Sequence, residues 1–301
     1  MSTAPGNASP RADARLVVLG RDPLTALGRA MDRLAERVED AEPGTIERRA
    51  DPSSLLVIGA SAADPLGLAE RAASCGWRVL LEPVAAGCAA GLANLVRGTP
   101  PGTVLPALRR RHEPEARWAQ AAVGRGAIGL PWGAHAEALA SAAPDAVADA
   151  LDLADALERA AAVRLERAVR LDRPPRAHRR SGAGRPQTLL ASLAFEHGVV
   201  GQLAVRAARR ERGSAEALEM ASLRVTGSHG TVLAELDAPV VYVTVPGGPQ
   251  RERLGPDGAD RLLGAFLALA EGGSLEGLAS MDEAARLLSL IEGRTRTGGE
   301  R

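Results

Sequence analysis

Three short apolar runs near the start of the chain constrain its fold more than any other feature. They are Arg15–Gly20 (RLVVLG), Leu55–Ile58 (LLVI) and Arg78–Leu81 (RVLL). Short runs without polar alternation are typical of strands that are buried on both faces, as in a parallel sheet. The segments between them have helical spacing, over Leu24–Asp40 and Pro65–Cys75. Strands that alternate with helices predict a parallel α/β sheet.

The segment after the first strand is predicted to form one helix that runs as far as Asp40. Asp22 and Pro23 supply an N-cap and a first-turn proline, and the pair Pro43-Gly44 ends the helix. The stretch from there to the next strand is short. No second strand that ends in an acid, the usual partner of ribose hydroxyls in a nucleotide site, is evident in it.

The pattern changes after about residue 125, where strands follow one another closely. A long helix is predicted first, over Pro144–Arg159. The strand-like segments after it are Val163–Leu171, Thr188–Glu196, Val199–Ala207, Ala221–Val225, Thr231–Glu235 and Val240–Val245. Such a meander is typical of an open antiparallel sheet. Two helices close the chain, Ala259–Ala270 and Met281–Gly293.

These segments predict an α/β fold in two parts. Residues 15–108 are expected to form a Rossmann-like parallel-sheet domain that binds a nucleotide. Residues 109–301 are expected to form an α+β domain with an open and mostly antiparallel sheet, which the resemblance given below makes the domain for substrate binding and oligomerisation. The closing helices can pack back on the first domain, and residues 1–14 are expected to be a disordered tail.

Composition excludes several classes of function. Basic and acidic residues number 37 each and aromatic residues make up 2% of the chain, which disfavours a nucleic-acid partner. Every basic residue is an arginine, so lysine Schiff bases and phosphate-loop lysines are excluded. No apolar run approaches the roughly 20 residues of a membrane helix, and the opening residues lack a signal-peptide core. We expect a cytoplasmic protein without a membrane partner.

Six segments follow one another in a characteristic order: Asp51–Ser61, Gly76–Ala85, Arg109–Pro131, Phe195–Val205, Ala221–Leu236 and Phe266–Gly293. In this order the chain resembles the Gfo/Idh/MocA oxidoreductases. The resemblance implies a Rossmann domain paired with an antiparallel-sheet domain, and NAD or NADP as the cofactor. It also implies a small sugar-, polyol- or imine-type substrate, the last because thiazolinyl imine reductases resemble the family without its lysine.

The segment Gly20–Gly28 (GRDPLTALG) stands where the family carries closely spaced glycines. Such glycines let backbone amides approach the cofactor's pyrophosphate. Here Asp22 would repel a phosphate and Pro23 lacks an amide donor, so the Rossmann loop is degenerate; Arg21 can offset these losses by direct contact. The resemblance implies cofactor contacts from Gly20, Arg21, Gly59, Ser61 and Pro83.

Two further departures concern the groups that move protons. The Glu82-Pro83 segment lacks the lysine of the family's Glu-Lys-Pro, and the pattern Asp-x-x-x-His-x-x-Asp has Asp149 in place of the histidine. Its outer acids are Asp145 and Asp152. Asp145 and Asp149 share one helical face, so in a dry site their repulsion would raise one pKa and create a usable acid. The candidate catalytic groups are Asp145, Asp149 and Glu82, and Asp152 is a candidate substrate ligand.

Each candidate also has a structural interpretation. Solvated acids in a first helical turn are favoured by the helix dipole, and Glu82 can be an exposed strand end. Arg109–Arg111 can be a solvated face, or Arg109 can bind a substrate carboxylate or phosphate. The run Arg173, Arg176, Arg179, Arg180 and Arg185 can be a solvated loop or an anion clamp. No spacing of Cys and His residues predicts a metal site.

Two functions remain open. The first is an NAD(P)-dependent oxidoreductase with an atypical site. The second is a redox-inactive member of the family, a pseudoenzyme that acts as a binding protein, a partner subunit or a catalyst of a non-redox step. In both cases a homo-oligomer is expected, because the uncovered face of the open sheet can pack against a second copy of the chain.

Overall fold

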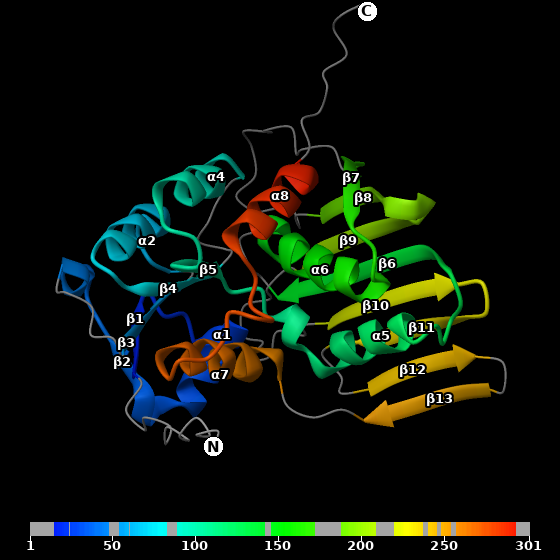
Figure 1. The fold of residues 1–301 in the computed structure, drawn as a ribbon, viewed down its shortest axis with the longest axis horizontal. Coiled ribbons are helices and arrows are strands. Elements are labelled where there is room, and N and C mark those ends of the chain that lie inside the picture. The colour runs from blue at the N-terminus through cyan, green and yellow to red at the C-terminus, as the bar shows by residue number, and fades with distance from the viewer. Residues whose placement is uncertain are drawn as a thin grey trace, which may run out of the picture.

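A computed structural model describes residues 15–23, 25–47, 54–59, 61–82, 89–141, 146–171, 188–208, 220–236, 240–245, 248–253 and 257–292. Predictions made for residues 1–14, Pro83, Asp145 and the five loop arginines fall outside these ranges. The chain forms two lobes, each built on one sheet (Figure 1). Among the described helices, none is long and apolar enough to cross a membrane.

The first sheet has five parallel strands in the order β2-β1-β3-β4-β5. The strands are β1 (Arg15–Leu19), β2 (Val38–Asp40), β3 (Ser54–Ile58), β4 (Arg78–Leu81) and β5 (Val104–Pro106). Successive residues of each strand face opposite sides of the sheet. Leu56 and Ile58 join one buried cluster, while Leu55 and Val57 join another. Burial on both faces explains why these strands appear in the sequence as unbroken apolar runs.

Helices cover both faces of this sheet. They are α1 (Ala26–Arg33), α2 (Pro65–Ser74), α4 (Ala89–Gly98) and α7 (Gly258–Ala270). Apolar side chains of α2 and α4 belong to the first cluster, and those of α1 and α7 to the second. Helix α7 therefore returns late in the chain to lie beside α1 (Figure 1).

The second sheet has eight strands in the order β13-β12-β11-β10-β6-β9-β8-β7, antiparallel except for the parallel pair β6–β9. Its strands are β6 (Pro131–Ser141), β7 (Leu165–Arg170), β8 (Thr188–Phe195), β9 (Val200–Ala208), β10 (Met220–Gly227), β11 (Gly230–Glu235), β12 (Val240–Val245) and β13 (Gly248–Arg253). Helices α5 (Pro114–Gly124) and α6 (Ala146–Ala161) pack against this sheet. The predicted fold class is confirmed.

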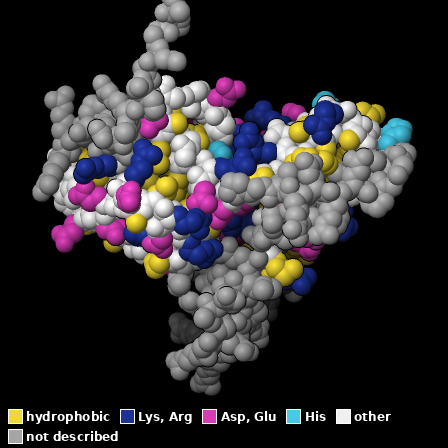
Figure 2. Space-filling view, turned by 90° about the horizontal axis from the view of Figure 1, so that it is seen from below, with side chains coloured by type: hydrophobic (Ala, Val, Ile, Leu, Met, Phe, Trp, Pro, Cys, Tyr) yellow, Lys and Arg dark blue, Asp and Glu magenta, His cyan; other side chains and the backbone are white. Residues whose placement is uncertain are grey.

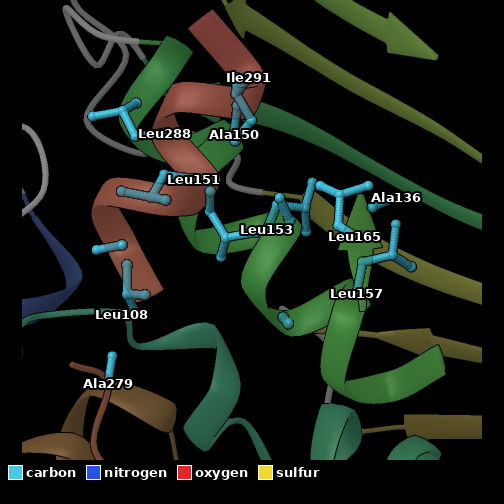
Figure 3. Close-up of a cluster of buried hydrophobic side chains, with 14 of the residues drawn as sticks. Leu108, Ala136, Ala150, Leu151, Leu153, Leu157, Leu165, Ala279, Leu288 and Ile291 are labelled. Atoms are coloured by element: carbon cyan, nitrogen blue, oxygen red, sulfur yellow. The ribbon is translucent and has the colours of Figure 1, made fainter. Parts of the chain in front are cut away.

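The closing helix α8 (Met281–Glu292) packs against both α4 and α6. Leu288 and Ile291 of α8 lie beside Leu151 of α6 (Figure 3). Arg286 donates to the Glu158 carboxylate at 2.6 and 2.8 Å, and Glu292 accepts the backbone N–H of α4's first residue at 3.1 Å. This helix therefore ties the two lobes together.

The prediction of one helix as far as Asp40 is wrong in its second half. Helix α1 ends at Arg33, a 3-10 turn η1 (Ala35–Arg37) follows, and β2 pairs in parallel with β1. Val38 fits a helical pattern, but β1 offers it an unpaired strand edge and an apolar cluster. Tertiary pairing overrides the local pattern here. A second strand that ends in an acid, Asp40, therefore exists.

Candidate functional site

A hollow of ≈440 Å³ lies at the carboxyl ends of β1 and β2. Its lining consists of Val18, Gly20, Arg21, Pro23, Asp32, Asp40 and Ala41. In open parallel sheets, ligands bind outside the carboxyl ends of the strands, where the strand order reverses. In this sheet the order reverses between β1 and β3. The hollow therefore occupies one side of the position that the fold itself provides for a ligand.

The loops after β1 and β3 are packed backbone against backbone. Gly20 has φ +66°, and a Cβ there would overlap the backbone of Ala62. A Cβ on Gly59 would overlap the Gly20 carbonyl. The Ser61 amide donates to the Gly20 carbonyl at 3.2 Å, and its hydroxyl to the Arg21 carbonyl at 3.3 Å. Four predicted cofactor residues, Gly20, Arg21, Gly59 and Ser61, thus lie together at this edge.

The start of α1 supplies its own cap. Thr25, and not Asp22 as predicted, is the N-cap residue: its hydroxyl accepts the Gly28 N–H at 2.9 Å. The same hydroxyl donates to the Asp22 carbonyl at 3.0 Å, and a Cβ on Gly28 would overlap that carbonyl. One of the amides that a phosphate could use at a helix N-terminus is therefore already bonded inside the chain.

Arg21 bridges two acids across the hollow. Its guanidinium forms ion pairs with Asp32 of α1 and, at 3.3 Å, with Asp40 of β2. The side chain of Arg21 is 20% exposed, against 54% for Asp32 and 65% for Asp40. With two acids and one base, the hollow carries a formal charge of −1. It suits a ligand that offers hydroxyl donors more than one that adds a further anion there.

Asp40 is a functional candidate that the sequence reasoning missed. It lies at the end of β2 and twenty positions after Gly20. A carboxylate about 20 residues after the first glycine of a Rossmann turn is placed to bond ribose hydroxyls. That spacing could have found Asp40 even though β2 is only three residues long.

Glu82 follows β4 and is buried, with 7% exposure. Its backbone N–H donates to the Ile58 carbonyl at 3.0 Å and extends the ladder of the sheet. The alternative of an exposed strand end is therefore wrong. Glu82 remains a candidate acid at the carboxyl edge of the first sheet.

The described acids of α6 are not fully solvated. Asp149, in the first turn, is half-buried, and Asp152, one turn on, is buried. Asp152 Oδ1 accepts the Arg110 N–H at 3.0 Å. Burial raises the pKa of Asp152 to about 6, against the opposing effect of Arg109 and Arg110. A group that titrates near neutrality can take part in proton transfer or hold a substrate hydroxyl where it reaches a site.

The arginine run before α5 is largely buried, so a solvated face is the wrong interpretation for Arg110 and Arg111. These residues lie in the 3-10 turn η3 (Arg110–His112). Arg111 binds both oxygens of Asp155, at 2.8 and 2.5 Å, and contacts Glu283 of α8 at 3.5 Å. The turn is thereby fixed to α6 and α8.

Arg109 also has a partner within the chain. Its guanidinium lies 3.2 Å from Glu113, whose second oxygen accepts the Gly258 N–H at the start of α7 at 3.0 Å. Burial raises the pKa of Glu113 to about 8. Burial lowers the pKa of His112 to about 4, helped by nearby arginines. Arg109 and Asp152 thus belong to a buried polar network that joins η3, α6, α7 and α8.

Charges are mixed on the surface as well as in the interior. Figure 2 shows acidic and basic side chains interspersed over the lobe of the first sheet. Within the described residues, no three His, Cys, Asp or Glu side chains gather so that they could hold a metal ion.

Comparison with known proteins identifies similar structures. No family model matches the chain, and no curated protein matches it by sequence. An oxidoreductase from Pseudomonas syringae matches over 93% of this chain and 95% of its own, with TM-score 0.70 and 12% identity. Levoglucosan dehydrogenase in complex with NADH matches over 93% of this chain and 86% of its own, with TM-score 0.66 and 16% identity.

An oxidoreductase from Agrobacterium radiobacter in complex with NAD+, L-tartaric acid and magnesium matches over 93% of this chain and 95% of its own, with TM-score 0.63 and 15% identity. At such identities the likeness establishes the fold. The chain therefore has the architecture of these oxidoreductases, a Rossmann-like parallel sheet followed by a mixed sheet with helices on one face.

Proposed function

We propose that the chain is an NAD-dependent oxidoreductase of the Gfo/Idh/MocA type that acts on a small sugar- or polyol-like substrate. The observation that carries the proposal is the Asp40 carboxylate at the end of β2, inside the hollow beside Gly20. An acid in this position bonds ribose hydroxyls in dinucleotide sites. The architecture shared with proteins solved in complex with NADH and NAD+ supports it.

The residues around the hollow fit the adenosine half of such a cofactor. Gly20 and Gly59 leave the loops without Cβ atoms where the two backbones approach, and Asp40 supplies acceptors for ribose hydroxyls. When bound, the cofactor supplies hydride transfer. Asp32 and Asp40 together outweigh Arg21 in charge, so a 2′-phosphate would be repelled. We therefore assign NAD rather than NADP.

The proton that accompanies hydride transfer needs an acid or base from the chain itself. Asp149 stands on α6 at the position of the family's histidine, and Glu82 lies buried at the end of β4. We assign the proton to these two groups, together with Asp145. Asp152, with its pKa near 6, and Arg109 complete the assignment as substrate-binding groups.

Calorimetric titration with NADH and NADPH tests the proposal. We expect NADH to bind and Asp40→Asn to weaken its affinity about tenfold to a hundredfold, since one charge-assisted hydrogen bond is worth about 1.5–3 kcal/mol. Asp260→Asn is the matched control: Asp260 is a carboxylate of α7 that pairs with Arg33, outside the hollow. Absence of NADH binding up to millimolar concentration would exclude the redox function.

The second candidate function is a redox-inactive protein of the same fold. Thr25 occupies the Gly28 amide and Pro23 lacks an N–H, which both reduce the donors for a pyrophosphate. This candidate predicts that NADH binding is weak or absent, and that Asp149→Asn and Glu82→Gln leave any activity of the protein unchanged. Substrate screens in the presence of NAD+ distinguish the two functions, because only the oxidoreductase reduces NAD+.

We also propose that the protein is a homo-oligomer through the open face of the second sheet. Helices α5 and α6 cover the other face (Figure 1). His135, Glu137, Gln202 and Arg224 are exposed on neighbouring strands β6, β9 and β10. Val200 is 58% exposed at one end of β9. Such a mixed polar and apolar surface fits an interface between two copies.

A further inference from the structure

We propose that Asp32 withholds one terminal nitrogen of Arg21 from phosphate, so that a phosphate-bearing ligand must break the Arg21–Asp32 ion pair before it can bind both terminal nitrogens of the guanidinium. The inference rests on the proposed function in one respect, that the hollow receives an adenine nucleotide. It assigns a regulatory role to Asp32, a residue outside the positions that bind ribose.

The hollow gives a phosphate few partners other than Arg21. Among the described residues that line it, Arg21 is the one cation. Pro23 has no N–H, and the Thr25 hydroxyl holds the Gly28 amide at 2.9 Å. A glycine-rich loop binds phosphate through backbone amides. Here the guanidinium supplies a fixed positive charge and five donors.

Arg21 is paired with two acids of the hollow. One terminal nitrogen, Nη2, pairs with Asp32 and the other, Nη1, with Asp40 at 3.3 Å. A ribose would take over the Asp40 carboxylate and release Nη1. Asp32 belongs to α1 rather than to β2, and its pairing with Nη2 would persist. A phosphate that binds both terminal nitrogens therefore takes the released Nη1 and competes with Asp32 for Nη2.

The surroundings of the Arg21–Asp32 pair favour an exchange of partners. The Asp32 side chain is more than half exposed, while Arg21 is mostly covered. Water can solvate the released Asp32 carboxylate at little cost, and an exposed ion pair is worth little. The guanidinium, which is less accessible to water, gains more from a bidentate phosphate. Loss of Asp32 would remove the competitor and leave Arg21 in place.

The test compares the wild type, Asp32→Asn, Arg21→Ala and the double variant by calorimetry, with inorganic pyrophosphate, adenosine, AMP and NAD+ as probes. We expect Asp32→Asn to bind pyrophosphate and AMP about threefold to tenfold more tightly, and adenosine within twofold of the wild type. In the Arg21→Ala background the same substitution should give no gain. That result separates release of Arg21 from a general loss of negative charge.

The inference is overturned if Asp32→Asn binds pyrophosphate no more tightly than the wild type, or if the gain survives in the Arg21→Ala background. Weaker pyrophosphate binding by Asp32→Asn would show instead that Asp32 positions the guanidinium. Failure of the proposed function gives a different result, in which NAD+ and adenosine do not bind the wild type. The pyrophosphate titrations still measure the competition for Arg21 in that case.

Discussion

Arginine–aspartate pairs occur in two regions of this molecule, in very different surroundings. In the hollow, Arg21 pairs with acids that are more than half exposed. Under α6, the side chains of Arg111 and Asp155 are 1% and 5% exposed. Water can replace either partner in the first region but not in the second. The same chemical pair is therefore exchangeable where a ligand is expected and permanent where the two lobes meet.

The largest effect on stability is expected when the buried pair Arg111–Asp155 is broken. Asp155→Ala leaves the Arg111 guanidinium buried without its bidentate partner and should lower the free energy of unfolding by about 3–5 kcal/mol. Asp32→Asn, at the exposed pair, should change it by less than about 1 kcal/mol. Urea denaturation measures both. Equal losses in the free energy of unfolding at the two positions would contradict the comparison. A smaller loss in the double variant Arg111→Met/Asp155→Leu than in Asp155→Ala would show that the cost comes from the unpaired buried charge.

Glu113 makes the buried network sensitive to pH. Its pKa in the folded chain is about 8, above the ordinary value of 4.5, so the folded state binds more protons between these values. The stability that Glu113 contributes is then full below pH 4.5 and falls as the pH rises towards 8, by up to about 1.4 kcal/mol per pH unit. Denaturation of the wild type and Glu113→Gln between pH 6.5 and 8 checks this.

The measurement is confined to this pH range because His112 changes the stability in the opposite direction at lower pH. Its pKa is lowered from 6.5 to about 4, so the stability it contributes is present above pH 6.5 and is lost as the pH falls towards 4. Above about pH 7, where His112 and Asp152 have largely lost their protons, the slope belongs mainly to Glu113. A wild-type slope that persists in Glu113→Gln would rule out this carboxyl group as its source.

In the hollow, charge decides which cofactor binds. Asp40→Ser removes one of two carboxylates and should raise the affinity for NADPH relative to NADH about tenfold, equivalent to about 1.4 kcal/mol. Fluorescence titration with both cofactors measures this ratio. Asp260→Ser, which alters an acid outside the hollow, should leave it unchanged. An unchanged ratio in Asp40→Ser would mean that Asp40 does not face the ribose.

The smallest effect on the fold is expected at the open sheet. Arg224 is exposed on β10, opposite His135 of β6. Arg224→Glu should lower the oligomer mass measured by light scattering, while the free energy of unfolding of the monomer changes by no more than about 0.5 kcal/mol. Glu36→Arg, in the exposed turn η1, is the control. A mass unaffected by Arg224→Glu would place the interface elsewhere.

Much of the fold follows from the sequence because periodicity and burial agree there. The runs at Leu55–Ile58 and Val240–Val245 became strands, and α7 began within one residue of the prediction. β2 was not predicted from the sequence, because Val38 fits both a helical spacing and a position in an edge strand. Only the pairing with Leu16 of β1 decides between them.

The site was predictable to a smaller degree. Gly20 and Gly59 lie at one edge because strand ends fix their position in a parallel sheet, while their contact with a cofactor stays a prediction. The burial of Arg111 could not be predicted, since Asp155 and Glu283 lie 44 and 172 residues away along the chain. Local charge density alone indicates a solvated face. The pairing partners that reverse this interpretation are known only when the helices are packed.

The position of α7 has a consequence for how the chain is made. One face of the first sheet is covered by α1 and by Leu262, Leu263 and Phe266 of α7. The ribosome synthesises that helix about 150 residues after β5, the last strand of the sheet. Until then Leu55, Val57 and Leu80 lack part of their cover. The nascent first lobe therefore has to wait, with an apolar face partly open, for a segment that emerges near the end of translation.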